Sequence, residues 1–179
     1  MAAALSGRRP FLDPPSILYM AAVPRRFPGG RKNKHWEEPD MITASFCFEA
    51  LLLIWFFGCI VTYRFGKVLL VKGVGVKSAE FGMLVTYSAC VVLRAVVPGV
   101  GTWLTLAVLV FWLVVQYFCH WHYTIWGATQ KKIDGYNQCF DGSLCVVPRK
   151  SDRLIPDFYH IVLHLFIAIN IILLLFILL

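Results

Sequence analysis

The sequence has few charged residues for its length. Asp, Glu, Lys and Arg make up 15% of the 179 residues, whereas a soluble domain carries about 25%. Hydrophobic residues account for 59% of the chain and aromatic residues for 15%. This composition is typical of a small polytopic membrane protein and disfavours an ordinary soluble domain.

The sequence also lacks the motifs that would identify a common chemistry. The string VKGVGVKS at residues 71–78 does not have the spacing of a phosphate-binding loop. There is no paired CxxC to hold zinc and no Asn-x-Ser/Thr acceptor for glycosylation. We also find no Ser/His/Asp set and no pair of catalytic carboxylates in a supporting context. The sequence therefore identifies no reaction, substrate or family.

Residues 1–40 lack the apolar period of a helix or strand. Prolines interrupt the segment at positions 10, 14, 15, 24 and 28, and glycines follow at 29 and 30. We predict a disordered basic tail, because seven of the 17 Lys and Arg lie before residue 40. We expect no secretory signal peptide, since no short apolar core with a cleavage site follows the basic residues. An Arg-rich, acid-poor start is a feature of mitochondrial transit peptides, but the prolines argue against the amphipathic helix that such peptides need.

Four apolar stretches are long enough to cross a bilayer as helices, which takes about 18 or more apolar residues. They lie at about 42–63, 81–97, 102–122 and 158–179. Pro98, Gly99 and Gly101 separate the second stretch from the third and predict a tight antiparallel hairpin. The predicted fold is all-α, a four-transmembrane-helix bundle over residues 41–179.

The basic residues are divided between the two sides of this bundle. Seven lie in the tail and nine in the loops at 64–80 and 127–157. Basic residues beside membrane spans hold anionic lipid headgroups, so we expect lipid rather than nucleic acid as their partner. The difference between seven and nine basic residues is too small to decide the orientation. The first helix usually dominates the orientation, and here it favours a cytoplasmic tail. We expect an endoplasmic reticulum, other endomembrane or plasma membrane location in preference to the mitochondrial inner membrane.

Three polar residues fall in the same half of the predicted bundle. At about 1.5 Å per residue, Glu49 lies about 10 Å and Arg94 about 5 Å below the tail side, with Asn170 in that half of the last span. We predict that Glu49 and Arg94 form a structural ion pair with Asn170 nearby. The alternatives are that Arg94 reaches the headgroups alone, or that the group is a substrate or proton site. A row of small residues leads to Arg94 and predicts that this face points inward: Gly82, Thr86 and Cys90.

Four of the five histidines flank the last loop: His120, His122, His160 and His164. His160 and His164 share a helix face, whereas His120 and His122 diverge on a regular helix. Neutral imidazole is the commonest metal ligand, so a metal, haem or pH-sensing site is one hypothesis. The alternative places the first two in an interfacial aromatic belt and the last two in hydrogen bonds between helices. That alternative is favoured, and we expect no metal and no cofactor.

Cys139 and Cys145 are the two cysteines that share a loop. They flank a turn predicted at Asp141–Gly142. A cytoplasmic tail would put this loop on the exoplasmic side, where we expect a disulfide between them. On the cytosolic side both thiols would be free. The other four cysteines lie in predicted spans, where a thiol behaves as a small apolar group.

A non-catalytic function is favoured: a membrane protein that assembles with, or helps to traffic, another membrane protein. Four short spans with small loops leave little room for a solvent-filled pathway in a monomer. The first alternative is a small metallo- or haem-binding redox enzyme that uses the histidines. The second is an oligomer that conducts ions or protons through Glu49 and Arg94.

Overall fold

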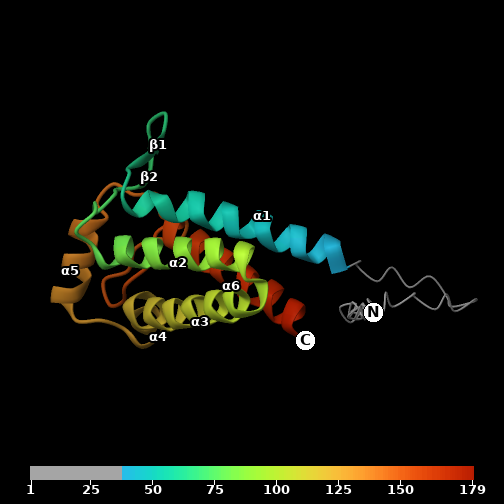
Figure 1. Ribbon diagram of the computed structural model, residues 1–179. Coiled ribbons are helices and arrows are strands. Elements are labelled where there is room, and N and C mark those ends of the chain that lie inside the picture. Colours follow the sequence, from blue (N-terminus) through green and yellow to red (C-terminus); the bar gives the residue numbers. More distant parts are fainter. Residues whose placement is uncertain (1–37) are drawn as a thin grey trace, which may run out of the picture. The chain divides into compact units, whose positions relative to one another are not determined.

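The computed structural model describes residues 38–179, and every structural statement below refers to them. The predicted tail lies almost entirely outside this range. The described chain is mostly helical, and its four long helices form a bundle (Figure 1). These helices are α1 (Glu38–Phe56), α2 (Ala79–Val96), α3 (Pro98–Gln116) and α6 (Phe158–Leu178).

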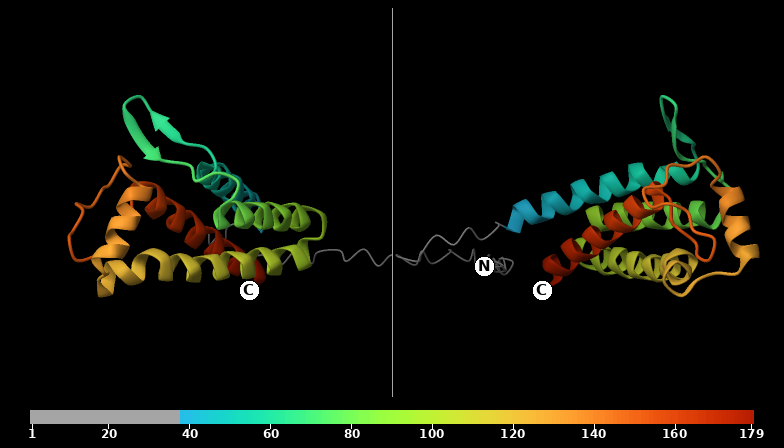
Figure 2. Two further views of the ribbon diagram at one scale, coloured as in Figure 1. Left: turned by 90° about the vertical axis from the view of Figure 1, so that its left-hand side faces the viewer. Right: turned by 180° about the vertical axis from the view of Figure 1, so that it is seen from behind.

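Within residues 38–179, four segments are long and apolar enough to cross a membrane: Asp40–Cys59, Ala79–Val96, Pro98–Trp126 and Phe158–Leu178. The start of α1, the turn between α2 and α3, and the end of α6 lie at one end of the bundle (Figures 1 and 2). The longer connections lie at the opposite end, which we call the loop end. The prediction of four long apolar helices is confirmed, with changes at their boundaries.

The first apolar helix ends earlier than predicted. After Phe56 the chain makes one 3-10 turn, η1 (Phe57–Cys59), and then forms two antiparallel strands, β1 (Tyr63–Phe65) and β2 (Val68–Val71). The Tyr63 hydroxyl donates to the Ile54 carbonyl at 2.6 Å, so the strand folds back on the end of α1. Gly66 makes the hairpin turn with a φ of 58°. A purely all-α prediction is therefore wrong for residues 63–71, where β-branched and aromatic residues favour a hairpin.

The turn between α2 and α3 consists of Val97 alone. Pro98 begins α3, where its missing N–H leaves no helical bond unmade. Gly101 lies directly against Arg94: a Cβ built on Gly101 would be 2.2 Å from the Arg94 Cα. The two helices therefore approach closely at this end because position 101 has no side chain.

The last loop is partly helical, contrary to prediction. It contains α5 (Gln130–Cys139), whose buried residue is Ile133, and it follows α4 (His122–Trp126), which extends the third apolar segment beyond its predicted end. The Leu144 N–H donates to the Leu69 carbonyl at 2.9 Å, and the Phe158 N–H donates to the Leu144 carbonyl at 2.8 Å. These bonds tie the loop to β2 and fix the start of α6.

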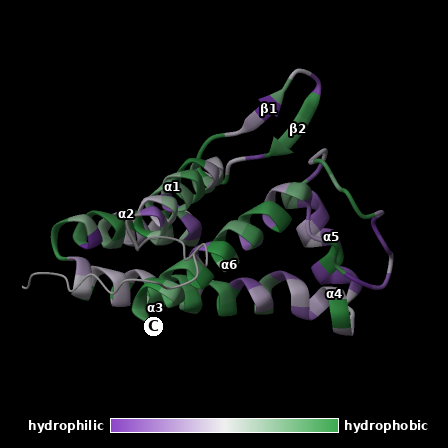
Figure 3. Cartoon of the chain, turned by 90° about the vertical axis from the view of Figure 1, so that its right-hand side faces the viewer, coloured by the Kyte–Doolittle hydropathy of each residue, from purple (hydrophilic) through white to green (hydrophobic). Residues whose placement is uncertain are grey.

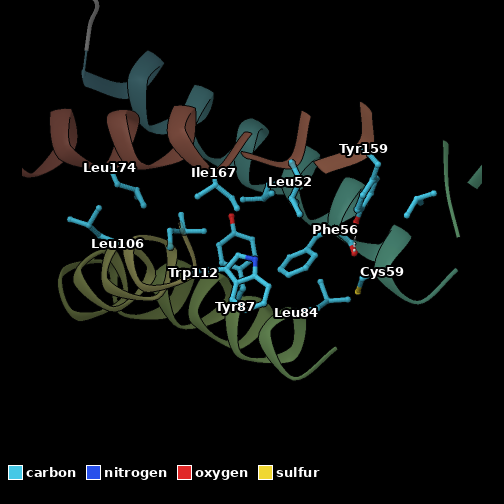
Figure 4. Close-up of a cluster of buried hydrophobic side chains, with 13 residues drawn as sticks. Leu52, Phe56, Cys59, Leu84, Tyr87, Leu106, Trp112, Tyr159, Ile167 and Leu174 are labelled. Atoms are coloured by element: carbon cyan, nitrogen blue, oxygen red, sulfur yellow. Dashed lines mark hydrogen bonds between the residues drawn. The ribbon is translucent and has the colours of Figure 1, made fainter. Parts of the chain in front are cut away.

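The core lies between the four long helices (Figure 4). Tyr87 of α2, Trp112 of α3, Leu52 of α1 and Ile167 of α6 are all buried there. The long helices consist mostly of hydrophobic residues (Figure 3). Many of their large apolar side chains are exposed on the outside of the bundle. Exposed examples come from every long helix: Ile54, Val92, Phe111 and Phe176. The outer surface of the bundle is thus apolar, while several polar groups lie inside it.

Candidate functional site

A cluster of histidines lies at the loop end, where the third apolar helix changes its winding. The π-helical turn η2 (Tyr117–Trp121) follows α3, and the His122 N–H donates to the Tyr117 carbonyl five residues back. Such turns insert an extra residue and are frequent at functional sites. His120 is buried here, whereas His122 is only half-buried and packs on the rings of Tyr117, Phe118 and Tyr123.

Asp157 starts α6 and holds His160 in place. One carboxylate oxygen, Oδ1, accepts from the His160 backbone N–H at 3.0 Å. The same oxygen lies 2.6 Å from Nδ1 of the His160 ring. An Asp at the N-cap with a polar residue three positions later is a local arrangement that closes the first helical turn. The sequence DFYH therefore builds an aspartate–histidine pair as it starts the helix.

This bond sets the proton positions on His160. A carboxylate accepts a hydrogen bond, so the His160 Nδ1 carries a proton, and in the neutral ring Nε2 is left as an acceptor. The ring packs against His120, with centroids 4.5 Å apart, and against Phe140 at 4.8 Å. The structure thus brings His120 and His160, from different helices, into direct contact.

In His164 the Nδ1 atom is a hydrogen-bond acceptor, whereas in His160 it is a donor. The Trp121 indole N–H donates to the His164 Nδ1 at 2.8 Å. Neutral His164 therefore carries its proton on Nε2, and this atom is buried without a partner in the described structure. The His164 and His120 rings are 5.6 Å apart. One imidazole of the cluster offers an acceptor nitrogen and another offers a donor.

These assignments do not favour a metal or a haem. Residues 38–179 contain no group of three or more His, Cys, Asp or Glu side chains placed to hold a metal ion. The lone pair of His164 Nδ1 already accepts the hydrogen bond from Trp121. Two imidazoles of the cluster therefore remain as possible ligands. Those two, His120 and His160, lie with their rings in contact, so that no porphyrin fits between them.

A pocket of about 380 Å³ opens beside the cluster. It lies against one face of α5, and we call it the α5 pocket. Its polar lining consists of Glu80 of α2, Cys119 and His120 of η2, Lys131, Lys132, Tyr136 and Cys139 of α5, and His160 of α6. A second cavity of about 20 Å³, enough for one water molecule, shares Glu80 and His160 with it and reaches the buried Gln116. His160 thus borders both cavities.

Burial and hydrogen bonding have opposite effects on the pKa of Asp157. Burial raises the pKa of the carboxyl, but the hydrogen bond and charge interaction with His160 lower it, and the net pKa is below the ordinary value of 3.8. Burial also raises the pKa of the nearby Tyr136 hydroxyl. Asp157 is therefore a carboxylate and Tyr136 a neutral donor at pH 7.

The lowered pKa of Asp157 predicts an acid-sensitive loop end. The Asp157–His160 contribution to stability is complete above the unfolded-state pKa of about 3.9, and it is lost as the pH falls through the lower folded-state pKa. Asp157→Asn keeps a good helix cap but removes the charge, and we expect it to cost about 1.5–3 kcal/mol at pH 7. Thermal unfolding of both proteins in detergent from pH 7 to pH 3 should show the two stabilities converging below pH 4. A constant difference across this range would contradict the assignment.

A second polar cluster lies inside the bundle. The Arg94 Nη1 donates to Glu49 Oε1 at 2.5 Å, and both side chains are buried. The Arg94 guanidinium also lies over the Phe46 ring, 4.3 Å from its centroid. Asn170 donates to the carbonyls of Phe48 and Phe166 at 3.2 and 2.8 Å. The structure thus brings the predicted charged pair together and hydrogen-bonds Asn170 to the backbone of the helix that carries Glu49.

The small residues before Arg94 do not all face inward. Gly82 and Thr86 are exposed, and a Cβ on Gly82 would meet open space. The Thr86 hydroxyl donates to the Gly82 carbonyl of its own helix. Arg94 is buried although this row is not, because an α-helix turns 100° per residue and residues twelve apart do not lie on one line.

The expected disulfide does not form in the structure. Cys139 and Cys145 are both free thiols. Cys139 ends α5 and faces the α5 pocket, whereas the Cys145 thiol points to the Ser143 carbonyl at 3.7 Å. Helix α5 and the bridge to β2 hold the two cysteines in different surroundings, which the loop spacing alone did not indicate.

Comparison with known protein families, with curated proteins and with solved structures gives no match to this chain. Sequence reasoning named the histidines but missed Asp157, Trp121 and Tyr136 as their neighbours. The spacing Asp-x-x-His at a helix start was the available signal for Asp157.

Proposed function

We propose that this chain is an integral membrane protein that crosses the bilayer four times, with the start of α1 and the end of α6 on the same side. Four apolar helices of sufficient length and an apolar outer surface support this. A buried Glu49–Arg94 pair also fits, because charged groups within a membrane face the bundle interior and pair with each other. The location remains as expected from sequence: the endoplasmic reticulum, another endomembrane or the plasma membrane.

We further propose that the loop end is an acid–base site, which makes the protein a small membrane enzyme without a metal or haem. The observation that carries this proposal is the Asp157–His160 hydrogen bond beside the α5 pocket. A carboxylate that orients an imidazole is a common arrangement for proton transfer. His160 of this pair lines the α5 pocket, which is large enough for part of a substrate.

In this proposal each group has a defined task. His160 Nε2 takes a proton from a group bound in the α5 pocket, and the Asp157 carboxylate stabilises the imidazolium that forms. His120 packs against the His160 ring and limits its rotation. The water-sized cavity that His160 also lines can hold a water molecule that accepts this proton from His160 Nε2.

The replacement His160→Gln tests this function. General acid–base catalysis contributes about 10²–10⁴-fold to a rate, so we expect the conversion to fall by that factor. Because the substrate is unidentified, the assay is untargeted mass spectrometry of lipid extracts from cells that express each protein. A species that changes with wild type should revert with His160→Gln.

The matched control is His122→Gln. His122 is two residues from His120 but packs away from the cluster and does not line the pocket. This variant should retain the wild-type lipid profile. If the His122 and His160 variants behave alike at equal expression, or if wild type changes no species, the enzymatic proposal fails.

A second candidate function is the assembly or trafficking of another membrane protein, and an exposed face of α2 favours it. Gly82, Thr86 and Ala89 are small and lie on the outside of this helix. Small residues let helices approach closely within a bilayer, so this face suits a helix of a partner. Affinity purification for a stoichiometric partner tests this candidate.

Conduction of ions through Glu49 and Arg94 stays a prediction to be tested by flux in reconstituted vesicles, although the two charges are already paired.

A further inference from the structure

The α5 pocket carries an excess of positive charge. Its lining contains Lys131 and Lys132 and one carboxylate, Glu80, while Asp157 lies outside the lining and is hydrogen-bonded to His160. Lys132 has a defined position, because its Nζ lies 4.2 Å from the centroid of the Tyr123 ring. Arg149 adds a further positive charge nearby, because its Nη2 donates to the carbonyl of the lining residue Phe140. The pocket therefore favours an anion.

The start of α5 adds to this preference. The N-cap residue Thr129 makes no side-chain hydrogen bond to the helix, and the first turn contains no acidic residue. The N-terminal end of a helix carries partial positive charge and directs N–H groups outward. Lys131 and Lys132 lie in this first turn, so the N-terminal end of α5 carries both their positive charges and the positive end of the helix dipole.

A buried and unpartnered polar side chain completes the pocket. His120 lines it, is only 7% exposed, and its Nδ1 has no partner within the described structure. The hydroxyl of Tyr136, also in the lining, is likewise buried without a partner. Unpaired buried polar atoms are uncommon in native proteins, and an absent ligand is one explanation.

We propose that the α5 pocket binds the phosphate group of an amphipathic molecule through Lys131, Lys132, Tyr136 and His120. A tetrahedral dianion accepts hydrogen bonds in several directions, which suits donors that come from both α5 and η2. The proposal rests on the proposed acid–base function and deepens it, because it specifies the chemical class of the group placed beside His160. Phe118 of η2 and Ile125 of α4 are exposed apolar residues at this end of the bundle, so lipid chains can lie against it.

The test measures binding to the full chain in detergent through the thermal shift that each ligand produces. The probes are dioctanoyl phosphatidate, dioctanoylglycerol with the same chains but no phosphate, and inorganic phosphate. We expect phosphatidate to stabilise the protein saturably and dioctanoylglycerol to do so at least about tenfold more weakly. Tighter binding of phosphatidate than of inorganic phosphate identifies a lipid headgroup as the source, whereas equal affinities identify free phosphate.

Two double variants locate the site. Lys131→Gln with Lys132→Gln should weaken phosphatidate binding at least about tenfold, since each removes a charge-assisted contact. Lys67→Gln with Lys77→Gln removes the same charge from exposed positions in another loop and should leave binding unchanged. Equal losses in both variants, or equal binding of the phosphate-free lipid, would overturn the proposal.

The results for phosphate binding and catalysis can be separated. Phosphatidate binding that depends on Lys131 and Lys132, with no lipid change that depends on His160, would support the phosphate site and refute the enzyme. A conversion that depends on His160, with no phosphate binding, would support the enzyme and refute the phosphate site.

Discussion

Glu49→Gln and Arg94→Met are each expected to lower the stability of the detergent-solubilised protein by about 3–5 kcal/mol, because each leaves its partner buried and unpaired. Both side chains are almost completely enclosed, at 0% and 2% exposure, and they hold each other directly. Water cannot replace the lost partner at such depth. Thermal unfolding of each purified variant measures the effect, and Lys67→Met on an exposed loop controls for loss of a positive charge.

The double variant Glu49→Gln with Arg94→Met should recover a substantial part of this loss. No uncompensated charge remains inside the bundle, and the effects of two residues in contact do not add. The recovered part measures the coupling between the two side chains. Strictly additive losses would mean that the pair does not act as one unit. Stable single variants that lose activity or partner binding would instead point to a functional role for the pair.

Gly101→Ala is also expected to destabilise the protein, by separating α2 from α3 next to their shared turn. A Cβ at this position would be 2.2 Å from the Arg94 Cα and 2.4 Å from its backbone nitrogen. Backbone atoms cannot rotate away as a flexible side chain can, so the two helices must separate. Overpacking of this kind costs about 1–3 kcal/mol and occasionally more. Here the separation would also strain the Glu49–Arg94 pair, since Arg94 is the residue that is displaced.

The matched control is Gly99→Ala in the first turn of the same helix. A Cβ on Gly99 meets nothing within 4 Å, so this substitution should be neutral or slightly stabilising. Both variants change one hydrogen for a methyl group and lie two residues apart. Melting temperatures that fall equally in the two would show that the close approach at position 101 does not limit stability. Combining Gly101→Ala with Arg94→Met should give less than the sum of the two losses.

The sequence by itself was sufficient for the four apolar helices. The preference of a segment for an apolar environment is a sum over its own residues, and it changes little with what lies beside it. The same locality explains why Pro98 with Gly99 and Gly101 indicated a short turn. It also explains why depth arithmetic placed Glu49 and Arg94 at similar levels, since the rise per residue of a helix is constant.

Only the tertiary structure decided which side chains meet. Rotation of each helix about its axis is set by packing against the others, so the sequence could not show that Arg94 points inward while Gly82 and Thr86 point outward. The π-helical turn sends His120 to the interior and His122 away from it. The α5 pocket joins residues from four separate elements, brought together by contacts such as that between Leu144 and β2. Composition and spacing act along the chain and fix its helices, whereas a site depends on distances across it, which only packing determines.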